Sequence, residues 1–257
     1  MTKVTIKSAS QIEAMRRSGQ LLAEVFKAME PMVRPGVSTM EVNDFVTAYI
    51  CSELNARPAS IGQYGYRYAL NASINDVICH GIPSKEDVLG HADIVNFDIT
   101  LEFGGYIADS SQTYIMPEAS DGARALVANA YQAMVCGIRA VKPGARLGDV
   151  GYAIQKHAER AGYSVVREYC GHGIGRAMHE APEVLHYGRP ASGLPLMPGM
   201  TFTIEPMINQ GSARARTMSD GWTVRTADGG LSAQWEHTIL VTPSGFEVLT
   251  LRAGEEI

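Results

Sequence analysis

Four acidic residues could form a metal centre, because they lie on segments that otherwise carry small polar side chains and almost no lysine or arginine. They are Asp98, Asp109, Glu205 and Glu236. Like charges in one cleft raise each other's pKa unless a cation lies among them. Two divalent ions would cancel four carboxylates, and an oxygen-rich set with one imidazole suits manganese, iron or cobalt. Such ions about 3.5–4 Å apart would generate a hydroxide at neutral pH, which predicts a hydrolase.

The sequence around Asp98 and Asp109 predicts a β-hairpin. Apolar and polar residues alternate along the segment before Gly104-Gly105, which supplies a turn. If these two glycines form the loop, Asp109 lies opposite Thr100; if the loop begins one residue earlier, it lies opposite Asp98. Either register places both carboxylates on one face, about 5–8 Å apart. For any single acid, the simpler interpretation is that its carboxylate lies on a solvent-exposed sheet face and is hydrated.

The other two acids are predicted on strands of the same kind. Residues 201–205 and 232–239 each alternate polar and apolar side chains, with Glu205 and Glu236 on the polar faces. His237 falls on the opposite face from Glu236, which favours a structural role for this histidine.

Three of the seven histidines are candidates for the site. His80 follows an apolar pair in a loop-like setting, and His172 and His179 frame a glycine-rich stretch. In a dimetal site one of them would complete the ligand set and two would contact substrate, although glycine-flanked histidines are also ordinary turn residues. Another three lie in no constellation and are predicted to be ordinary surface or core residues: His91, His157 and His186.

Several other chemistries are excluded. The glycines near His172 do not form the dinucleotide fingerprint, because Arg176 stands where its third glycine belongs. A zincin motif fails, since Glu183 replaces the second histidine and Pro182 would break the required helix. A Cys170 nucleophile is disfavoured, because sequence neighbours rarely have the geometry for it.

An internal repeat predicts the elements that position these residues. The string VRPG at residues 33–36 recurs as VKPG at residues 141–144, after a long helical pattern and before a second helix in each case. In the first copy Ser38 precedes Glu41 by three residues, which is a capping box. We therefore expect one catalytic domain over residues 1–257, with internal halves of about 10–120 and 121–250. This pattern favours a pseudo-symmetric α+β fold with helices on one side of a shared sheet.

Composition limits the partners. Of 257 residues, 46% are hydrophobic and 19% charged, and the net charge of −5 comes without a basic run, so nucleic acid is not expected as the main partner. No segment approaches the about 20 apolar residues of a membrane span, and residues 1–7 resemble neither a signal peptide nor an anchor. Four scattered cysteines favour a reducing cytoplasm, and a monomer is the default expectation.

Five strings carry a resemblance to a known family that spans nearly the whole chain. They are CHGIP at 79–83, DIVNFD at 93–98, GHGIGR at 171–176, TIEPM at 203–207 and EHT at 236–238. In these strings the sequence resembles the type I methionine aminopeptidases of peptidase family M24, in their short bacterial form. The resemblance implies the pseudo-two-fold "pita-bread" fold, a curved antiparallel sheet with helices on its outer face. It also implies removal of the initiator methionine from nascent polypeptides in the cytoplasm, with transient ribosome contact.

The resemblance implies roles for individual residues. It makes five residues ligands of two divalent ions (Co, Mn, Fe or Zn): Asp98, Asp109, His172, Glu205 and Glu236. Asp109 and Glu236 would bridge both ions, and Glu205 would also carry a proton from water to the leaving amine. His80 and His179 would contact substrate, with His179 polarising the scissile carbonyl. A sodium or potassium ion would lie near three further residues: Asn75, Val77 and Ser232.

The pocket for the substrate side chain departs from the family pattern. Its implied members are Tyr64, Tyr66, Asn71, Met178 and Trp222. Asn71 and Met178 stand where cysteine and phenylalanine are frequent, Gln63 and Tyr64 replace a tyrosine–histidine pair, and Ser60 replaces another cysteine. Methionine is adaptable and keeps the wall apolar, whereas a buried asparagine amide needs a partner. We expect methionine specificity to be retained, with efficiency or inhibitor response altered.

Two alternatives stay open. One is a proline-specific dipeptidase or aminopeptidase of the same fold, although such enzymes usually carry an additional N-terminal domain. The other is a metal-free binding module on the same scaffold, which would have lost ligands that this sequence retains.

Overall fold

The computed structural model describes residues 4–257 of the chain. Residues 1–7 are expected to form neither a signal peptide nor an anchor, and the first three of them lie outside the described residues. In chain order the strands are β1 (Arg57–Pro58), β2 (Leu70–Ile74), β3 (Val77–Cys79), β4 (Ile94–Phe103), β5 (Tyr106–Ile115), β6 (Ser164–Val165), β7 (Gly171–Gly173), β8 (Glu180–Val184), β9 (Thr201–Ile204), β10 (Met207–Asn209), β11 (Ala215–Thr217), β12 (Val224–Thr226), β13 (Ser232–Gln234), β14 (His237–Thr242) and β15 (Gly245–Val248). Short helical turns lie at η1 (Glu30–Met32), η2 (Tyr49–Glu53) and η3 (Gln63–Gly65).

The helices follow the predicted repeat. Each half has a long helix, a Pro-Gly turn and a second helix: α1 (Ala9–Met29) and α2 (Thr39–Ala48), then α3 (Asp121–Arg139) and α4 (Leu147–Arg160). The capping box is confirmed, because Ser38 N donates to Glu41 Oε2 at 2.8 Å and Glu41 N donates to Ser38 Oγ at 3.3 Å. Gly36 and Gly144 occupy matching turn positions at φ +87° and +83°, which only glycine adopts without strain.

The expected arrangement of helices on antiparallel strands is confirmed, and the strands pair into four sheets. Their orders are β1-β4-β2 with β5 beside β4, β15-β14-β9-β7-β8, β13-β10-β6, and β11-β12-β3. The single strand predicted at residues 232–239 is wrong in one respect, because it is interrupted between β13 and β14. There the chain changes partner from β10 to β9, and Glu236 makes an isolated antiparallel bridge to Ser111.

The hairpin takes one of the two predicted registers. Gly104 and Gly105 form its turn at φ +60° and +79°, so Thr100 lies opposite Asp109. Asp98 lies diagonally across from Asp109 on the same face, and both carboxylates line one cavity.

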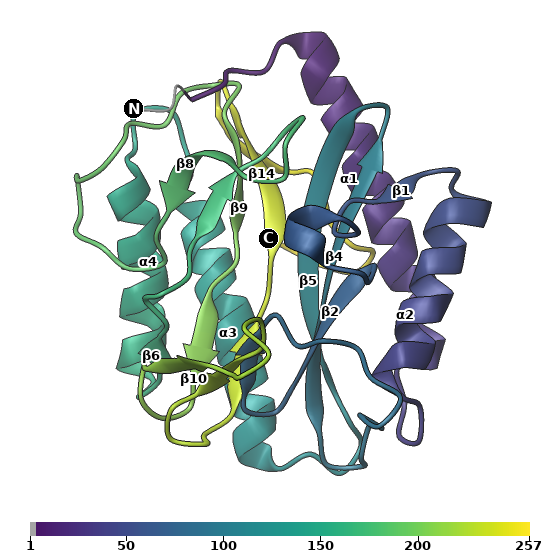
Figure 1. The fold of residues 1–257 in the computed structure, drawn as a ribbon. Coiled ribbons are helices and arrows are strands. Elements are labelled where there is room, and N and C mark those ends of the chain that lie inside the picture. Colours follow the sequence, from purple (N-terminus) through teal and green to yellow (C-terminus); the bar gives the residue numbers. More distant parts are fainter. Residues whose placement is uncertain (1–3) are drawn as a thin grey trace.

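Strand alternation separates the helix-covered face from the cavity face. In the first half Phe97, Ile99 and Leu101 of β4 pack in a core with Leu22 and Val25 of α1. In the second half β9 contributes its own apolar residues to a core built on α3 and α4. Figure 1 shows α1 and α2 beside the strands of the first half, and α3 and α4 beside those of the second. Within residues 4–257, no helix has the length and apolarity to cross a bilayer.

Candidate metal centre and substrate cavity

A cavity of about 860 Å³ is lined by both halves of the chain. Twelve residues assigned above to metal, catalysis or the side-chain pocket line it together: Tyr64, Tyr66, Asn71, His80, Asp98, Asp109, His172, Met178, His179, Glu205, Trp222 and Glu236. The fold therefore brings together residues that are separated by more than 170 positions in the sequence.

Three of the four acids lie close to the imidazole of His172. His172 Nε2 lies 3.5 Å from Glu205 Oε1 and 3.7 Å from Asp109 Oδ2. Asp109, His172 and Glu236 each offer a ligand atom within 4.8 Å of the others. Within residues 4–257 Asp109 Oδ1 is buried without a hydrogen-bond partner, as expected of an oxygen meant for an ion. Carboxylate oxygens and one imidazole suit a hard or borderline divalent metal, so the residues present fit the implied ions.

Burial makes these carboxylates costly as free anions. It is the largest cause that raises the pKa of Asp98 to about 6 and that of Glu205 to about 8. The pKa values of Asp109 and Glu236 lie well above the ordinary range, because burial is reinforced by the charges of the neighbouring acids. Positive charge from bound cations would favour the ionised forms, which also supports a metal centre.

The raised pKa values of Asp98 and Glu205 predict how the stability of metal-free protein changes with pH. Their folded pKa values lie above the unfolded values of about 4. Their contribution to stability is therefore fully present below about pH 4 and is lost as pH rises through about 6 for Asp98 and about 8 for Glu205. We expect the urea midpoint of chelated protein to fall between about pH 4 and pH 8, with a smaller fall after manganese is added. A profile that is flat without metal would contradict this expectation.

The backbone of β7 orients His172. The ring Nδ1 of His172 lies 3.1 Å from the carbonyl oxygen of Gly173. The backbone N–H of His172 donates to Thr203 Oγ1 at 2.9 Å. An Nδ1–H donated to that carbonyl leaves Nε2 as the free lone pair that faces the acids. Burial, with a smaller effect of His179, lowers the pKa of His172 to about 4, so the ring is neutral as a ligand must be.

His80 and His179 lie on two different elements beside the acids. His80 follows β3 at φ +59°, a conformation that costs energy for a residue with a side chain. Its ring lies 5.6 Å from that of Trp222, and burial lowers its pKa to about 4. The His179 ring stacks on Tyr64 at 6.1 Å and lies 4.4 Å from the ring of His172. Both imidazoles can thus contact a substrate next to the ligand set.

An ion pair fixes the loop that carries His179. Lys7 Nζ lies 2.6 Å from Glu180 Oε2, and both side chains are largely buried. The other oxygen of Glu180 accepts the N–H groups of Arg176 and Ala177, at 3.0 and 3.3 Å. The chain at residues 180–184 is strand β8, which confirms that the zincin helix is absent there.

The aromatic pocket lies beside Asp98. Tyr66 stacks on Trp222 with ring centroids 5.0 Å apart. The Asn71 amide joins this wall to the acids, since its Nδ2 donates to Asp98 Oδ2 at 3.3 Å and its Oδ1 accepts from Trp222 Nε1 at 3.5 Å. The amide that replaces a frequent cysteine therefore has partners, and Met178 completes an apolar side with 8% of its surface exposed.

Cys170 also lines the cavity without the properties of a nucleophile. Burial and the nearby charge of Glu205 raise the pKa of its thiol to about 11, so it stays protonated at neutral pH. This agrees with the exclusion of thiol chemistry from the sequence.

Sequence reasoning did not foresee the position of His186. The sequence predicts an ordinary surface or core residue, and His186 is fully buried in the core. Its Nε2 also accepts a hydrogen bond from the backbone N–H of Glu205 at 3.1 Å. Its spacing from Glu205 carries no periodic signal, because the contact arises only when β8 and β9 join the same sheet. The structure places His91 and His157 outside the cavity lining.

The three residues expected near a monovalent ion lie outside the cavity lining. Ser232 N donates to the carbonyl of Asn75 at 2.9 Å, so these two meet. Val77 lies on β3, where it pairs with Arg225 of β12. The monovalent site stays a prediction.

Comparison with known proteins defines the class. A model described as "Metallopeptidase family M24" matches residues 13–243. The chain therefore belongs to metallopeptidase family M24.

Within that family the resemblance to methionine aminopeptidases is confirmed. The methionine aminopeptidase of Salmonella typhimurium is 49% identical over 254 residues, which cover 99% of this chain and 96% of the relative. The crystal structure of methionine aminopeptidase from Rickettsia prowazekii has a TM-score of 0.95 at 45% identity, covering 97% of this chain and 100% of that one. An Xaa-Pro dipeptidase from Bacillus anthracis has a TM-score of 0.76 at 27% identity, and only 63% of that chain is covered.

Proposed function

We propose that this protein is a metal-dependent aminopeptidase that removes the N-terminal methionine from polypeptides. The observation that carries the proposal is the convergence of Asp109, Glu205 and Glu236 on the neutral imidazole of His172, in a cavity that Asp98 also lines. High identity to methionine aminopeptidases over nearly the whole chain supports the same activity. The dipeptidase alternative has less support, because that relative is matched over only part of its length.

The candidate ligands are those expected from the sequence. They are Asp98, Asp109, His172, Glu205 and Glu236, with Asp109 and Glu236 as the proposed bridging pair. When bound, two divalent ions would lower the pKa of water and stabilise the charge that develops on the attacked carbonyl. The donor set is compatible with cobalt, manganese, iron or zinc.

The chain's own residues supply proton transfer and substrate contacts. Glu205 Oε1 accepts a hydrogen bond from Thr203 Oγ1 at 2.7 Å. Glu205 would accept a proton from the attacking water and pass it to the leaving amine. His179, directly before β8, would donate a hydrogen bond to the oxygen of the scissile carbonyl. His80, directly after β3, would contact the substrate as well.

Removal of metal tests the proposal. Chelated protein should release no methionine from Met-Gly-Met-Met, and adding cobalt, manganese or iron should restore the release. Elemental analysis of untreated protein should find up to two divalent ions per chain. Release that survives exhaustive chelation would contradict the proposal, and release of an Xaa-Pro dipeptide product would favour the other peptidase.

Methionine specificity stays a prediction for the altered pocket. An unbranched thioether fits a slot between aromatic rings and Met178, so we expect faster cleavage of Met-Ala than of Leu-Ala peptides. The ratio of kcat/KM for the two peptides measures it, and equal values would contradict it.

The remaining assignments belong to the same proposal. The substrates would be nascent chains in the cytoplasm, with transient ribosome contact and a monomeric enzyme in a single domain over residues 1–257. A sodium or potassium ion near Asn75, Val77 and Ser232 would complete the set of cofactors.

A further inference from the structure

The two strands that carry Asp109 and Glu236 meet at an irregular seam. Regular ladder pairing is absent here among residues 4–257, apart from the isolated bridge between Ser111 and Glu236. Hydroxyl groups replace the ladder: Thr238 Oγ1 accepts from Asp109 N at 3.1 Å and donates to its carbonyl at 2.8 Å. Ser110 Oγ donates to the carbonyl of Glu236 at 2.7 Å. The spacing of these two acids therefore depends on side chains.

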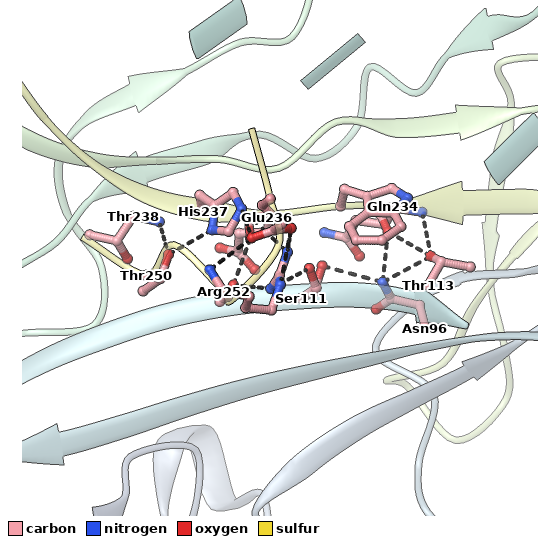
Figure 2. A network of polar contacts seen from close by, with 12 residues as sticks. Asn96, Ser111, Thr113, Gln234, Glu236, His237, Thr238, Thr250 and Arg252 are labelled. Carbon is pink, nitrogen blue, oxygen red and sulfur yellow. Dashed lines mark hydrogen bonds and ion pairs between the residues drawn. The ribbon is translucent and has the colours of Figure 1, made fainter. Parts of the chain in front are cut away.

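Arg252, from the C-terminal segment, is bonded to this seam from behind. Its Nη1 donates to Ser110 Oγ at 2.7 Å and to the carbonyl of Ser111 at 3.3 Å. The same Ser111 carbonyl accepts the N–H of Glu236 at 3.1 Å. One guanidinium thus contacts the residues directly after Asp109 and the carbonyl that holds Glu236, as Figure 2 shows in part.

Arg252 is itself held in one position. It is 7% exposed, and its Nε and Nη2 donate to Glu255 Oε1 at 3.2 and 2.9 Å. Its guanidinium also lies over the rings of Phe26 and Trp235, at 5.0 and 5.6 Å from their centroids. A charge this buried needs all of these partners, so the segment has one well-defined position.

Three more contacts join the same segment to the residues after Glu236. Thr250 Oγ1 accepts Thr238 N at 3.0 Å and lies 2.9 Å from His237 Nδ1, while His237 Nε2 lies 3.2 Å from Glu255 Oε2. The two contacts of Thr250, with Thr238 and with His237, are visible in Figure 2. We call Thr250, Arg252 and Glu255 the C-terminal clasp.

We propose that the C-terminal clasp is a positioning device for the metal centre, in which Arg252 sets the separation of Asp109 and Glu236. The inference rests on the proposed metal site and adds a residue set that never touches the ions. Partners of metal ligands commonly change metal affinity about 10–100-fold when they are removed. By linkage, if docking of the clasp strengthens metal binding, metal must stabilise the docked clasp to the same extent.

The test compares metal affinity in three variants by calorimetry on chelated protein. Arg252→Met keeps much of the side chain's length and should weaken binding of manganese by about 10–100-fold. Arg252→Lys keeps the charge but cannot form the same fork, so we expect an intermediate affinity. Arg16→Met is the matched control, because Arg16 makes a forked ion pair with Glu247, at 2.7 and 2.9 Å, away from the seam. Its metal affinity should equal that of the parent protein.

Hydrogen exchange supplies a second measurement that does not use activity. In the parent protein manganese should slow hydrogen exchange of the backbone amides of Thr238 and Leu249. The Leu249 N–H donates to the carbonyl oxygen of Thr238 at 2.9 Å. The effect should disappear in Arg252→Met. If that variant does not fold, Glu255→Gln carries the same test and should weaken manganese binding in the same direction.

The outcomes separate this inference from the function on which it rests. Parent protein that binds no manganese would overturn both. Parent protein that binds manganese with the same affinity as the folded clasp variants would overturn the positioning role alone. A loss of affinity in Arg16→Met equal to that in Arg252→Met would also overturn it, since general destabilisation would then explain the change.

Discussion

Replacing Glu205 with glutamine is expected to lower kcat by about 10²–10⁴-fold, the usual contribution of a general acid–base group. Glutamine keeps the shape of the side chain and an oxygen for the Thr203 hydroxyl, which lies 2.7 Å from Glu205 Oε1. It cannot accept and return a proton. Release of methionine under saturating substrate measures the effect.

Glu205 is also a candidate ligand, so metal content must be measured in the same sample. A variant that retains its ions and loses kcat isolates the proton-transfer role. Glu118→Gln removes a carboxylate from an exposed pair with His91 and should leave kcat unchanged. If the Glu205 variant retained full kcat with its metal, another group would have to carry the proton.

Replacing His179 with alanine is expected to lower kcat by about 10²–10³-fold, as the loss of one oxyanion donor commonly does. The ring lies at the cavity beside His172, at 4.4 Å between ring centroids. Burial lowers the pKa of His179, so the ring is neutral and offers one N–H to a developing negative charge. Because the interaction strengthens in the transition state, kcat should fall more than KM rises.

Two controls accompany this variant. His91→Ala removes an exposed imidazole that lies 3.6 Å from Glu118 and should change neither parameter. Elemental analysis of His179→Ala should find the same metal content as in the parent, since His179 is not among the candidate ligands. A rise in KM alone would reassign His179 to ground-state binding.

Local features of the fold were predictable because their causes are local. The Ser38–Glu41 capping box, the Pro-Gly turns and the apolar stripe of α1 depend on residues within a few positions of each other. The shared face of Asp98 and Asp109 was predictable for a similar reason, since strand alternation orients side chains whatever the partner strand. The hairpin register stayed open, because two adjacent loops satisfied the same turn residues.

Features that depend on contacts distant in sequence were not predictable. The break between β13 and β14 arises where one chain leaves β10 and joins β9. The contact of His186 with Glu205, and the seating of Arg252 against Ser110, join elements that no sequence spacing relates. A periodic pattern shows which face a residue occupies, but not which residue of another element it meets.

The sequence by itself determined the chemistry available to this protein: four acids on polar strand faces with few cations to pair them, and three candidate imidazoles in loop-like or glycine-rich segments. Those features follow from residue type and short-range periodicity, which act before any distant contact forms. Only the tertiary structure decided that the carboxylates converge on His172 and that a C-terminal arginine braces the strands behind them. The reason is physical: distances between residues far apart in the chain are set by packing of the two halves, and metal affinity depends on those distances.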